Sequence, residues 1–209
     1  MKIMVCGKGG CGKTVVSALI AKELVNRGKR VLVVDTDESN ICAHRYLGLE
    51  TPKSLVNWFG GRNSIILRLR SVSPGDAPLF FEGELFIDDL VTEYAVGRDN
   101  LWLIAIGKIN HFREGCACPL NILARELLCS LKLRKDEFVV VDSDAGIEHF
   151  GRGVEAGCDL VLIVVEPSFE SIQLSRKIAS LAKEARKKVF TLANKVDAET
   201  RGLVEADAY

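Results

Sequence analysis

Short apolar runs rich in β-branched residues recur along the chain, separated by longer stretches of mixed polarity. Each run is four to six residues long. Continuous apolar runs of this length are typical of strands buried on both faces, as in a parallel sheet. The pattern therefore predicts six buried parallel strands, over residues 3–6, 31–34, 101–106, 138–141, 160–165 and 189–193.

Between these runs, apolar residues recur about every 3.6 positions, which is the period of an α-helix. The clearest such stretches cover residues 14–26, 121–131 and 169–185. Parallel strands must be joined by crossover connections, and a helix is the usual one. We therefore expect an α/β fold, with a doubly wound, mainly parallel sheet and helices on both of its faces.

The segment of residues 60–100 departs from this alternation of strand and helix. It contains the turn-forming pairs Gly60-Gly61 and Pro74-Gly75, followed by an acidic and aromatic run. We expect an irregular insertion on the sheet of a single domain that spans all 209 residues. The insertion is either a surface subdomain without chemistry or a contact surface for a partner or a dimer. Little chain follows the last predicted strand, so we expect a short C-terminus.

The composition is that of a globular protein without net charge. Of the 209 residues, 48% are hydrophobic, and 28 Lys and Arg balance 28 Asp and Glu. The longest apolar run, residues 160–165, is far shorter than the ~20 residues of a membrane-spanning helix. The apolar N-terminus is too short for a signal peptide. We therefore expect a cytoplasmic protein that binds no membrane and, without excess positive charge, no nucleic acid.

A phosphate-loop pattern lies directly after the first predicted strand and at the start of the first helix. Its residues are Gly7, Lys8, Gly9, Gly10, Cys11, Gly12, Lys13 and Thr14. Glycines let successive backbone N–H groups point at phosphate oxygens, and the helix N-terminus adds partial positive charge. We expect Lys13 to reach the β- and γ-phosphates and the Thr14 hydroxyl to bind Mg²⁺. The predicted nucleotide site also includes Val15, and we interpret Cys11 as a small loop residue.

Lys8 departs from the ordinary phosphate-loop pattern. A lysine at this place resembles the deviant loop of the MinD, ParA, ArsA and nitrogenase-iron-protein group. In that group the lysine reaches across a dimer interface to the nucleotide of the partner. The resemblance therefore implies that Lys8 is catalytic and that the protein forms a two-fold homodimer across paired nucleotides.

Acidic residues follow two of the predicted strands, at the end where ligands bind in α/β proteins. Asp37 follows the second strand, Asp142 follows the fourth, and Asp35 is expected to support Asp37. By resemblance to the same group, Asp37 is the switch aspartate that orients the attacking water, and Asp142 is the Walker B aspartate that holds Mg²⁺. Phosphoryl transfer depends on positioning and charge neutralisation. The predicted catalytic residues are Lys8, Lys13, Asp37 and Asp142, and those around Mg²⁺ are Thr14, Asp37 and Asp142.

Two further segments resemble the adenine contacts of this group. They are Glu166-Pro167, after the fifth predicted strand, and Asn194-Lys195, after the sixth. The second segment leaves an alternative open, because with Asp197 it also fits the NKxD motif, in which the aspartate pairs with guanine. We favour ATP because the deviant loop is typical of an ATP-using group.

Two of the seven cysteines, Cys116 and Cys118, lie two positions apart in a connection flanked by glycine and proline. An odd count of cysteines without a secretion signal argues against a disulfide framework. Two thiolates are too few for a closed tetrahedral site, but two copies in a symmetric dimer supply four ligands for Ni²⁺, Zn²⁺ or Cu(I). A structural zinc or a redox-labile disulfide is the alternative. The cysteines expected in the core are Cys6, Cys42, Cys129 and Cys158.

The order and spacing of these features resemble those of CooC-type ATPases over nearly the whole chain. The shared features are the deviant loop, Asp35-Thr36-Asp37, the pair of Cys116 and Cys118, Asp142, Glu166-Pro167 and Asn194-Lys195. The resemblance implies an ATP- and Mg-dependent dimer that binds nickel and delivers it to a carbon monoxide dehydrogenase-type metalloenzyme. The chain departs from that family at its C-terminus, which is shorter.

Three other functions remain open. A MinD- or ParA-like positioning ATPase would act on a membrane or DNA, an iron–sulfur scaffold would hold a cluster at the cysteines, and a nickel GTPase would use the NKxD motif. Residues 200–209 are few and acidic, which argues against a membrane-targeting helix. We interpret the chain as an ATP-dependent metallochaperone.

Overall fold

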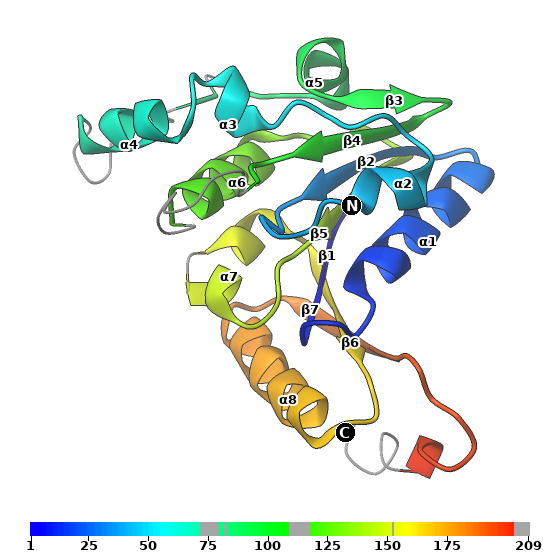
Figure 1. Cartoon of the computed structure of the whole chain (residues 1–209). Helices are drawn as coiled ribbons and strands as arrows, with labels where there is room; N and C mark the ends of the chain where they lie inside the picture. Colours follow the sequence, from blue (N-terminus) through cyan, green and yellow to red (C-terminus); the bar gives the residue numbers. More distant parts are fainter. Residues whose placement is uncertain (72–79, 82, 109–117, 152, 203–209) are drawn as a thin grey trace.

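A seven-stranded sheet forms the centre of the computed structural model, which describes residues 1–71, 80–81, 83–108, 118–151 and 153–202. The strands are β1 (Lys2–Gly7), β2 (Arg30–Asp35), β3 (Val96–Arg98), β4 (Leu101–Ala105), β5 (Glu137–Asp142), β6 (Leu160–Val165) and β7 (Lys188–Ala193). Their order across the sheet is β3-β4-β2-β5-β1-β6-β7, and only the β3–β4 pair is antiparallel. The predicted α/β class with a mainly parallel sheet is confirmed (Figure 1).

The six predicted strands are confirmed, each to within one residue at either end. Their apolar runs are continuous because the central strands are buried on both faces. In β2, for example, Val31 and Val33 pack in one core cluster while Leu32 and Val34 pack in another, on the opposite face. This two-sided burial is what a doubly wound sheet requires.

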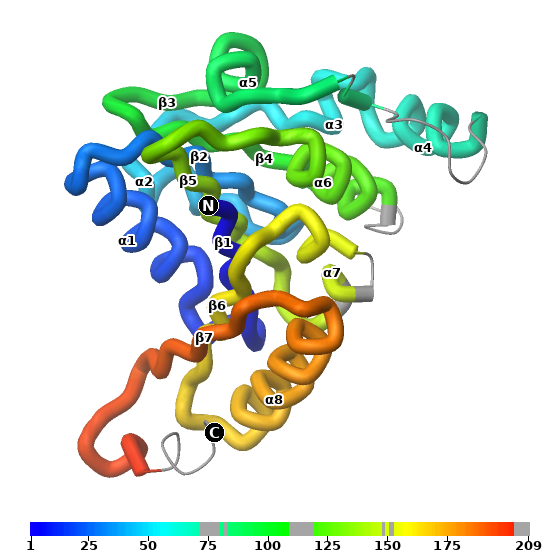
Figure 2. The backbone as a smooth tube through the Cα atoms, turned by 180° about the vertical axis from the view of Figure 1, so that it is seen from behind, coloured from blue at the N-terminus to red at the C-terminus, as the bar shows by residue number. Residues whose placement is uncertain are grey.

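Helices cover both faces of the sheet (Figures 1 and 2). On one face lie α1 (Lys13–Asn26) and α2 (Ala43–Leu47), whose Val16, Ala18 and Leu47 pack against β2. On the other face lie α6 (Cys118–Ser130) and α8 (Phe169–Glu184). The short α7 (Glu148–Gly151) and a 3₁₀ turn (Val154–Gly157) connect β5 to β6. The three predicted helices are therefore confirmed as α1, α6 and α8.

The sequence analysis does not predict β3, an edge strand of three residues. It pairs with β4 through a two-residue turn in which Asp99 and Asn100 have positive φ angles of 50° and 67°. Asp and Asn are among the residues that tolerate this conformation, which is typical of tight hairpins. A strand of three residues is too short to show an apolar pattern, so the turn residues Asp99 and Asn100 were the sequence feature that could have indicated it.

The segment predicted as an irregular insertion contains regular elements. Besides β3 it holds α4 (Arg62–Arg70) and α5 (Ile87–Glu93), and α3 (Leu55–Trp58) precedes it. Phe59, at the end of α3, packs its ring against those of Phe80, Phe81 and Tyr94. Several side chains of the segment are buried in the largest core cluster, namely Ile65, Phe80, Phe81, Ile87 and Leu90. The segment thus completes the core beside β4, while α4 projects outward (Figure 1).

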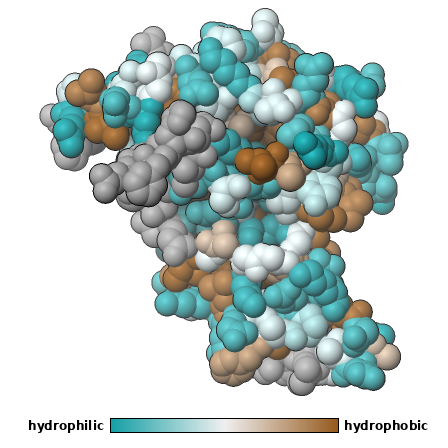
Figure 3. Space-filling model, viewed as in Figure 1, coloured by the Kyte–Doolittle hydropathy of each residue, from teal (hydrophilic) through white to brown (hydrophobic). Residues whose placement is uncertain are grey.

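The opposite edge of the sheet is less covered. The α8 helix packs on one face of β7, but on the other face Phe190 is 60% exposed and Leu192 is 36% exposed. On the face of the molecule drawn in Figure 3, by contrast, hydrophobic side chains are scattered among hydrophilic ones. In the described part of the chain, no helix has the length and apolar character needed to span a membrane.

Neighbouring residues on α6 provide a test of this packing. Leu123 is fully buried, whereas Ile122 is 38% exposed. We expect Leu123→Ala to lower the free energy of unfolding by about 2–5 kcal/mol, because it leaves a cavity in the core. The control Ile122→Ala should lower it by less than about 1 kcal/mol. Urea unfolding followed by circular dichroism measures both, and equal losses would contradict the placement of Leu123.

Candidate functional site

The phosphate loop joins the end of β1 to the start of α1, and two of its glycines are required by close approach. At Gly7, whose φ is 147°, an added Cβ would lie 2.4 Å from the carbonyl oxygen of Val164. At Gly12, with φ of 101°, it would lie 2.5 Å from the side-chain nitrogen of Asn194. Both positions also have a backbone conformation that favours glycine. These two glycines therefore set the course of the loop.

Contacts from β7 hold the loop in place. Asn194, directly after β7, donates from Nδ2 to the Cys11 carbonyl (2.9 Å), and Lys195 donates from Nζ to the Gly10 carbonyl (2.6 Å). Cys11 itself is fully buried and packs in the core cluster beneath α1. It therefore anchors the loop and is more than the small loop residue that the sequence suggested.

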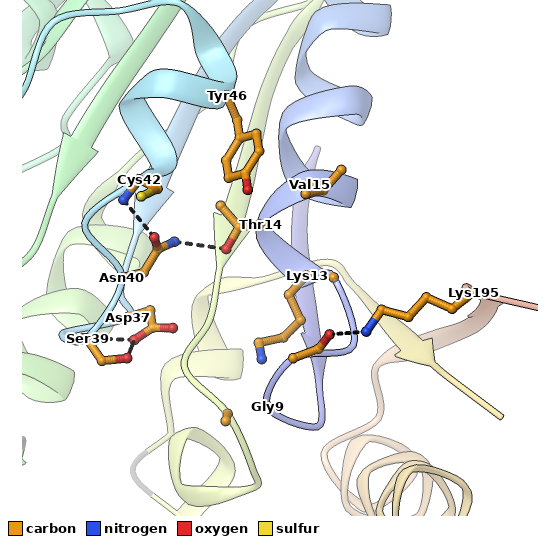
Figure 4. Close-up of a pocket in the computed structure, with 13 residues that line it drawn as sticks. Gly9, Lys13, Thr14, Val15, Asp37, Ser39, Asn40, Cys42, Tyr46 and Lys195 are labelled. Atoms are coloured by element: carbon orange, nitrogen blue, oxygen red, sulfur yellow. Dashed lines mark hydrogen bonds between the residues drawn. The ribbon is translucent and has the colours of Figure 1, made fainter. Parts of the chain in front are cut away.

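A pocket of about 490 Å³ opens beside the loop (Figure 4). The predicted site residues that line it are Gly9, Gly10, Gly12, Lys13, Thr14, Val15, Asp37 and Lys195. Residues that the sequence analysis did not assign also line it, namely Ser39, Asn40, Cys42, Tyr46 and Ala145. Lys13 is buried and donates from Nζ to the Lys8 carbonyl (3.2 Å). The structure thus brings the loop and the end of β2 to one cavity.

Oxygen atoms of Thr14 and Asp142 converge on one donor. The Asn40 amide donates to the Thr14 hydroxyl (2.8 Å) and to Oδ2 of Asp142 (3.3 Å), and Ser17 donates to Oδ1 of Asp142 (3.2 Å). Burial is the largest cause that raises the pKa of Asp142, and the bonds from Thr14 and Ser17 oppose it. The Asp142 carboxylate and the Thr14 hydroxyl both accept from the Asn40 amide. Oxygen atoms of this kind are the ligands that a hard cation such as Mg²⁺ prefers. Asn40, three residues past Asp37, is a site residue that the sequence analysis missed.

Asp37 is held at the end of β2 by its neighbours. Its Oδ1 accepts from the Ser39 backbone N–H (2.9 Å) and the Ser39 hydroxyl (2.6 Å). Its own N–H donates to Oδ1 of Asp35 (3.1 Å), a residue that is buried. Burial is the largest cause that raises the pKa of Asp35 to about 7, and the ammonium group of Lys108 opposes the shift. Asp35 therefore holds the backbone of Asp37, while the role of Asp37 as a switch aspartate stays a prediction.

Lys8 lies against its own chain. Its Nζ is 3.3 Å from Oε1 of Glu166 and 3.5 Å from the Ser168 hydroxyl. Lys195 approaches the other oxygen of Glu166 at 2.9 Å. The hydrogen bond from Lys195 is the largest cause that lowers the pKa of Glu166; burial opposes it, and the hydrogen bond from Lys8 lowers the pKa further. Glu166 and Pro167, predicted to contact the base, thus follow β6 beside the loop, with the Glu166 carboxylate bound to two lysines.

The comparisons with known proteins agree with this geometry. The CbiA family model, described as the CobQ/CobB/MinD/ParA nucleotide binding domain, matches residues 2–209. The chain belongs to this family. Its members are ATP-binding and ATP-hydrolysing P-loop proteins, so the chain is an ATPase of the MinD/ParA group.

Several known proteins are similar to the chain over most of its length. It is 51% identical over 204 residues to an uncharacterized ATP-binding protein of Methanocaldococcus jannaschii, covering 98% of this chain and 82% of the relative. It is 33% identical over 198 residues to the carbon monoxide dehydrogenase accessory protein CooC of Rhodospirillum rubrum, covering 94% and 74%. The MinD structure of Pyrococcus horikoshii with Mg-ADP superposes with a TM-score of 0.64 at 16% identity, covering 97% and 76%. That last likeness shows the fold alone.

The predicted cysteine pair of this MinD/ParA-group chain is not described by the structure. Cys116 lies outside the described residues, and Cys118 begins α6 with a side chain that is likewise outside them. Among the residues that are described, no group of three or more His, Cys, Asp or Glu is placed to hold a metal ion. The nickel or zinc site therefore stays a prediction.

The other cysteines only partly follow the prediction. Cys6 and Cys158 are buried, as expected. Cys129 is exposed, because the outer face of α6 is turned to solvent, so its assignment to the core was wrong. Cys42 is half-buried and lines the pocket beside the phosphate loop, so its assignment to the core was also wrong.

Gly12→Ala tests the contact between β7 and the loop. The new Cβ would clash with Asn194 and oppose the positive φ angle, so we expect affinity for an ATP analogue to fall about tenfold or more. Gly28→Ala is the matched control, because Gly28 also has positive φ but no atom within 4 Å of an added Cβ. It should lower stability by about 1 kcal/mol and leave nucleotide affinity unchanged. Isothermal titration measures both affinities, and equal losses would refute the contact.

Alkylation by iodoacetamide tests the cysteine environments. Burial raises the pKa of Cys158 to about 12, so little thiolate exists at pH 8, and we expect it to react about a thousandfold more slowly than exposed Cys129. Peptide mass spectrometry gives both rates. In urea the two rates should converge; a fast Cys158 in the folded protein would contradict its burial.

Proposed function

We propose that the protein is an ATP-dependent metallochaperone, a homodimer that binds nickel between paired cysteines and delivers it to a carbon monoxide dehydrogenase-type metalloenzyme. The observation that carries the metal step is Cys116-Ala117-Cys118 in a chain 33% identical to a carbon monoxide dehydrogenase accessory protein. Each chain contributes two thiolates, and a symmetric dimer combines four around one metal ion. Zn²⁺ fits the same ligands, so the metal must be identified by binding.

The pocket beside the phosphate loop supports the nucleotide step. Lys13 and the backbone N–H groups of the loop would bind the phosphates, and Thr14 and Asp142 would hold Mg²⁺, which supplies charge neutralisation when bound. Asp37 lines the same pocket and would orient the attacking water. The Asn40 amide would have to leave the two oxygens that it now contacts, so nucleotide binding would move the chain just after Asp37.

We propose ATP as the nucleotide in place of GTP. The guanine motif needs the Asp197 carboxylate free for the base, but its Oδ1 accepts from the N–H groups of Glu199 (3.1 Å) and Thr200 (2.8 Å) and from the Thr200 hydroxyl (2.6 Å). These bonds tie the carboxylate to its own turn. The adenine ring is assigned to the chain after β6 and β7, with the residues Glu166, Pro167, Asn194 and Lys195.

The dimer part of the proposal depends on Lys8. To reach a partner's nucleotide, Lys8 would have to exchange the carboxylate of Glu166 for a phosphate oxygen. Its side chain is 35% exposed, so the exchange needs no opening of the core. A phosphate with more than one negative charge is a stronger partner than a single carboxylate, which would favour the dimer when ATP is bound.

A MinD-like positioning ATPase is the second candidate. Escherichia coli MinD is 30% identical over 190 residues, covering 88% of this chain and 60% of that protein. This candidate would use the same nucleotide pocket but a macromolecular partner in place of a metal. It assigns no role to the cysteine pair, so the cysteines separate the two candidates.

Nickel binding tests the proposed function. We expect equilibrium dialysis to give about 0.5 nickel per chain, with the affinity raised about 5- to 150-fold by an ATP analogue relative to ADP, because metal and ATP favour the same closed dimer. The Cys116→Ser/Cys118→Ser variant should bind no nickel at this site. Cys129→Ser is the control, because it removes an exposed thiol outside the pair.

The oligomeric state, followed in parallel by light scattering, completes the test. Dimer formation with nickel and the ATP analogue together supports the shared site. Nickel that binds equally with all nucleotides and in the double variant would reject the metallochaperone and favour the positioning ATPase.

A further inference from the structure

A buried ion pair lies beneath the switch aspartate. Lys108, three residues past the end of β4, places Nζ 2.6 Å from Oδ2 of Asp35. The two side chains are only 18% and 3% exposed. The same ammonium group donates to the backbone carbonyl oxygen of Asp37. Lys108 is not part of any motif that the sequence analysis assigned.

Lys108 and Asp35 together fix the backbone of Asp37 on both sides. The Asp37 N–H donates to Oδ1 of Asp35 (3.1 Å), and the Asp37 carbonyl accepts from Lys108. The peptide groups before and after the Asp37 Cα are therefore both held. The Asp37 carboxylate is restrained separately, by the two hydrogen bonds that it accepts from Ser39.

The chain that carries Lys108 is itself held close to the core. Ile106 donates its N–H to the Asp35 carbonyl (2.9 Å) and accepts from the Val56 N–H (3.0 Å). At Gly107 an added Cβ would lie 2.5 Å from Leu120 and 2.8 Å from Val56. Gly107 thus permits a close packing that a side chain would prevent. Lys108 extends from a fixed backbone, which is what a positioning group requires.

We propose that Lys108 is a positioning residue for ATP hydrolysis, which acts by fixing the backbone of Asp37. The inference rests on the role proposed for Asp37 in orienting the attacking water. Lys108 does not line the nucleotide pocket, so its effect reaches the reaction through Asp37. A misplaced water-orienting group slows the chemical step more than it weakens nucleotide binding.

Two functions of Lys108 have to be separated by experiment. It neutralises the buried Asp35 carboxylate, which is a structural function, and it holds the Asp37 carbonyl. Lys108→Met removes both functions with a side chain of similar length. The double variant Lys108→Met/Asp35→Asn leaves no buried charge unpaired. The side-chain oxygen of the introduced asparagine can still accept from the Asp37 N–H, but the ammonium group that holds the Asp37 carbonyl is gone.

We expect Lys108→Met to lower kcat for ATP about tenfold or more while KM and the affinity for Mg²⁺ with an ATP analogue change less than about threefold. Its Tm should fall, because Asp35 is left buried and unpaired. The double variant should recover Tm but keep the low kcat. Lys132→Met is the control, since Lys132 forms an exposed ion pair with Glu84, and it should change neither quantity.

Each outcome decides the inference. A double variant with the wild-type kcat would show that Lys108 only neutralises Asp35 and would overturn the proposal, even if Lys108→Met alone does not fold. Asp37→Asn is measured in parallel. If it is slow while both Lys108 variants are normal, the inference fails and the role of Asp37 stands. If Asp37→Asn hydrolyses ATP normally, the proposed role of Asp37 fails and the inference fails with it.

Discussion

Two buried carboxylates stand side by side where the central strands end, and much of the site is arranged around them. Asp35 ends β2 and Asp142 ends β5, and the register of the parallel ladder makes them direct partners. The negative charge of each carboxylate makes ionisation of the other less favourable, because little water is present to screen the two charges. Lys108 compensates Asp35, and Ser17 and Asn40 donate to Asp142. Two of the groups that stabilise these acids therefore also contact the predicted site residues, since Lys108 donates to the Asp37 carbonyl and Asn40 donates to the Thr14 hydroxyl.

The phosphate loop is organised by distant parts of the chain as much as by its own glycines. Its carbonyl groups accept from Asn194 and Lys195, which follow the last described strand. These two contacts restrain the backbone of the loop at Gly10 and Cys11. A loop ordered in advance loses less conformational entropy when a ligand binds. The same Lys195 also contacts Glu166, so loop, β6 and β7 form one connected network.

The sequence predicts those features that have a local signature. Strands buried on both faces leave continuous apolar runs. Two of the loop glycines, Gly7 and Gly12, lie where an added side chain would clash, so both features can be read from the sequence. The edge strand β3 is too short to leave such a pattern. Lys108 and Asn40 could not be found in this way, because their partners are 73 and 102 residues away along the chain. Cys129 was misjudged because an apolar neighbourhood in sequence does not reveal which face of α6 is turned outward.

The exposed face of β7 has a consequence for how the molecule fluctuates. An edge strand with one solvent-exposed face is among the first parts of a sheet to unfold locally, because few contacts are lost when it does. Asn194 and Lys195 lie at the end of this strand and hold the nucleotide loop. When β7 opens locally, the loop loses its anchors while the rest of the sheet stays intact. The local stability of the phosphate loop therefore depends on that of an edge strand, which is lower than the stability of the central strands.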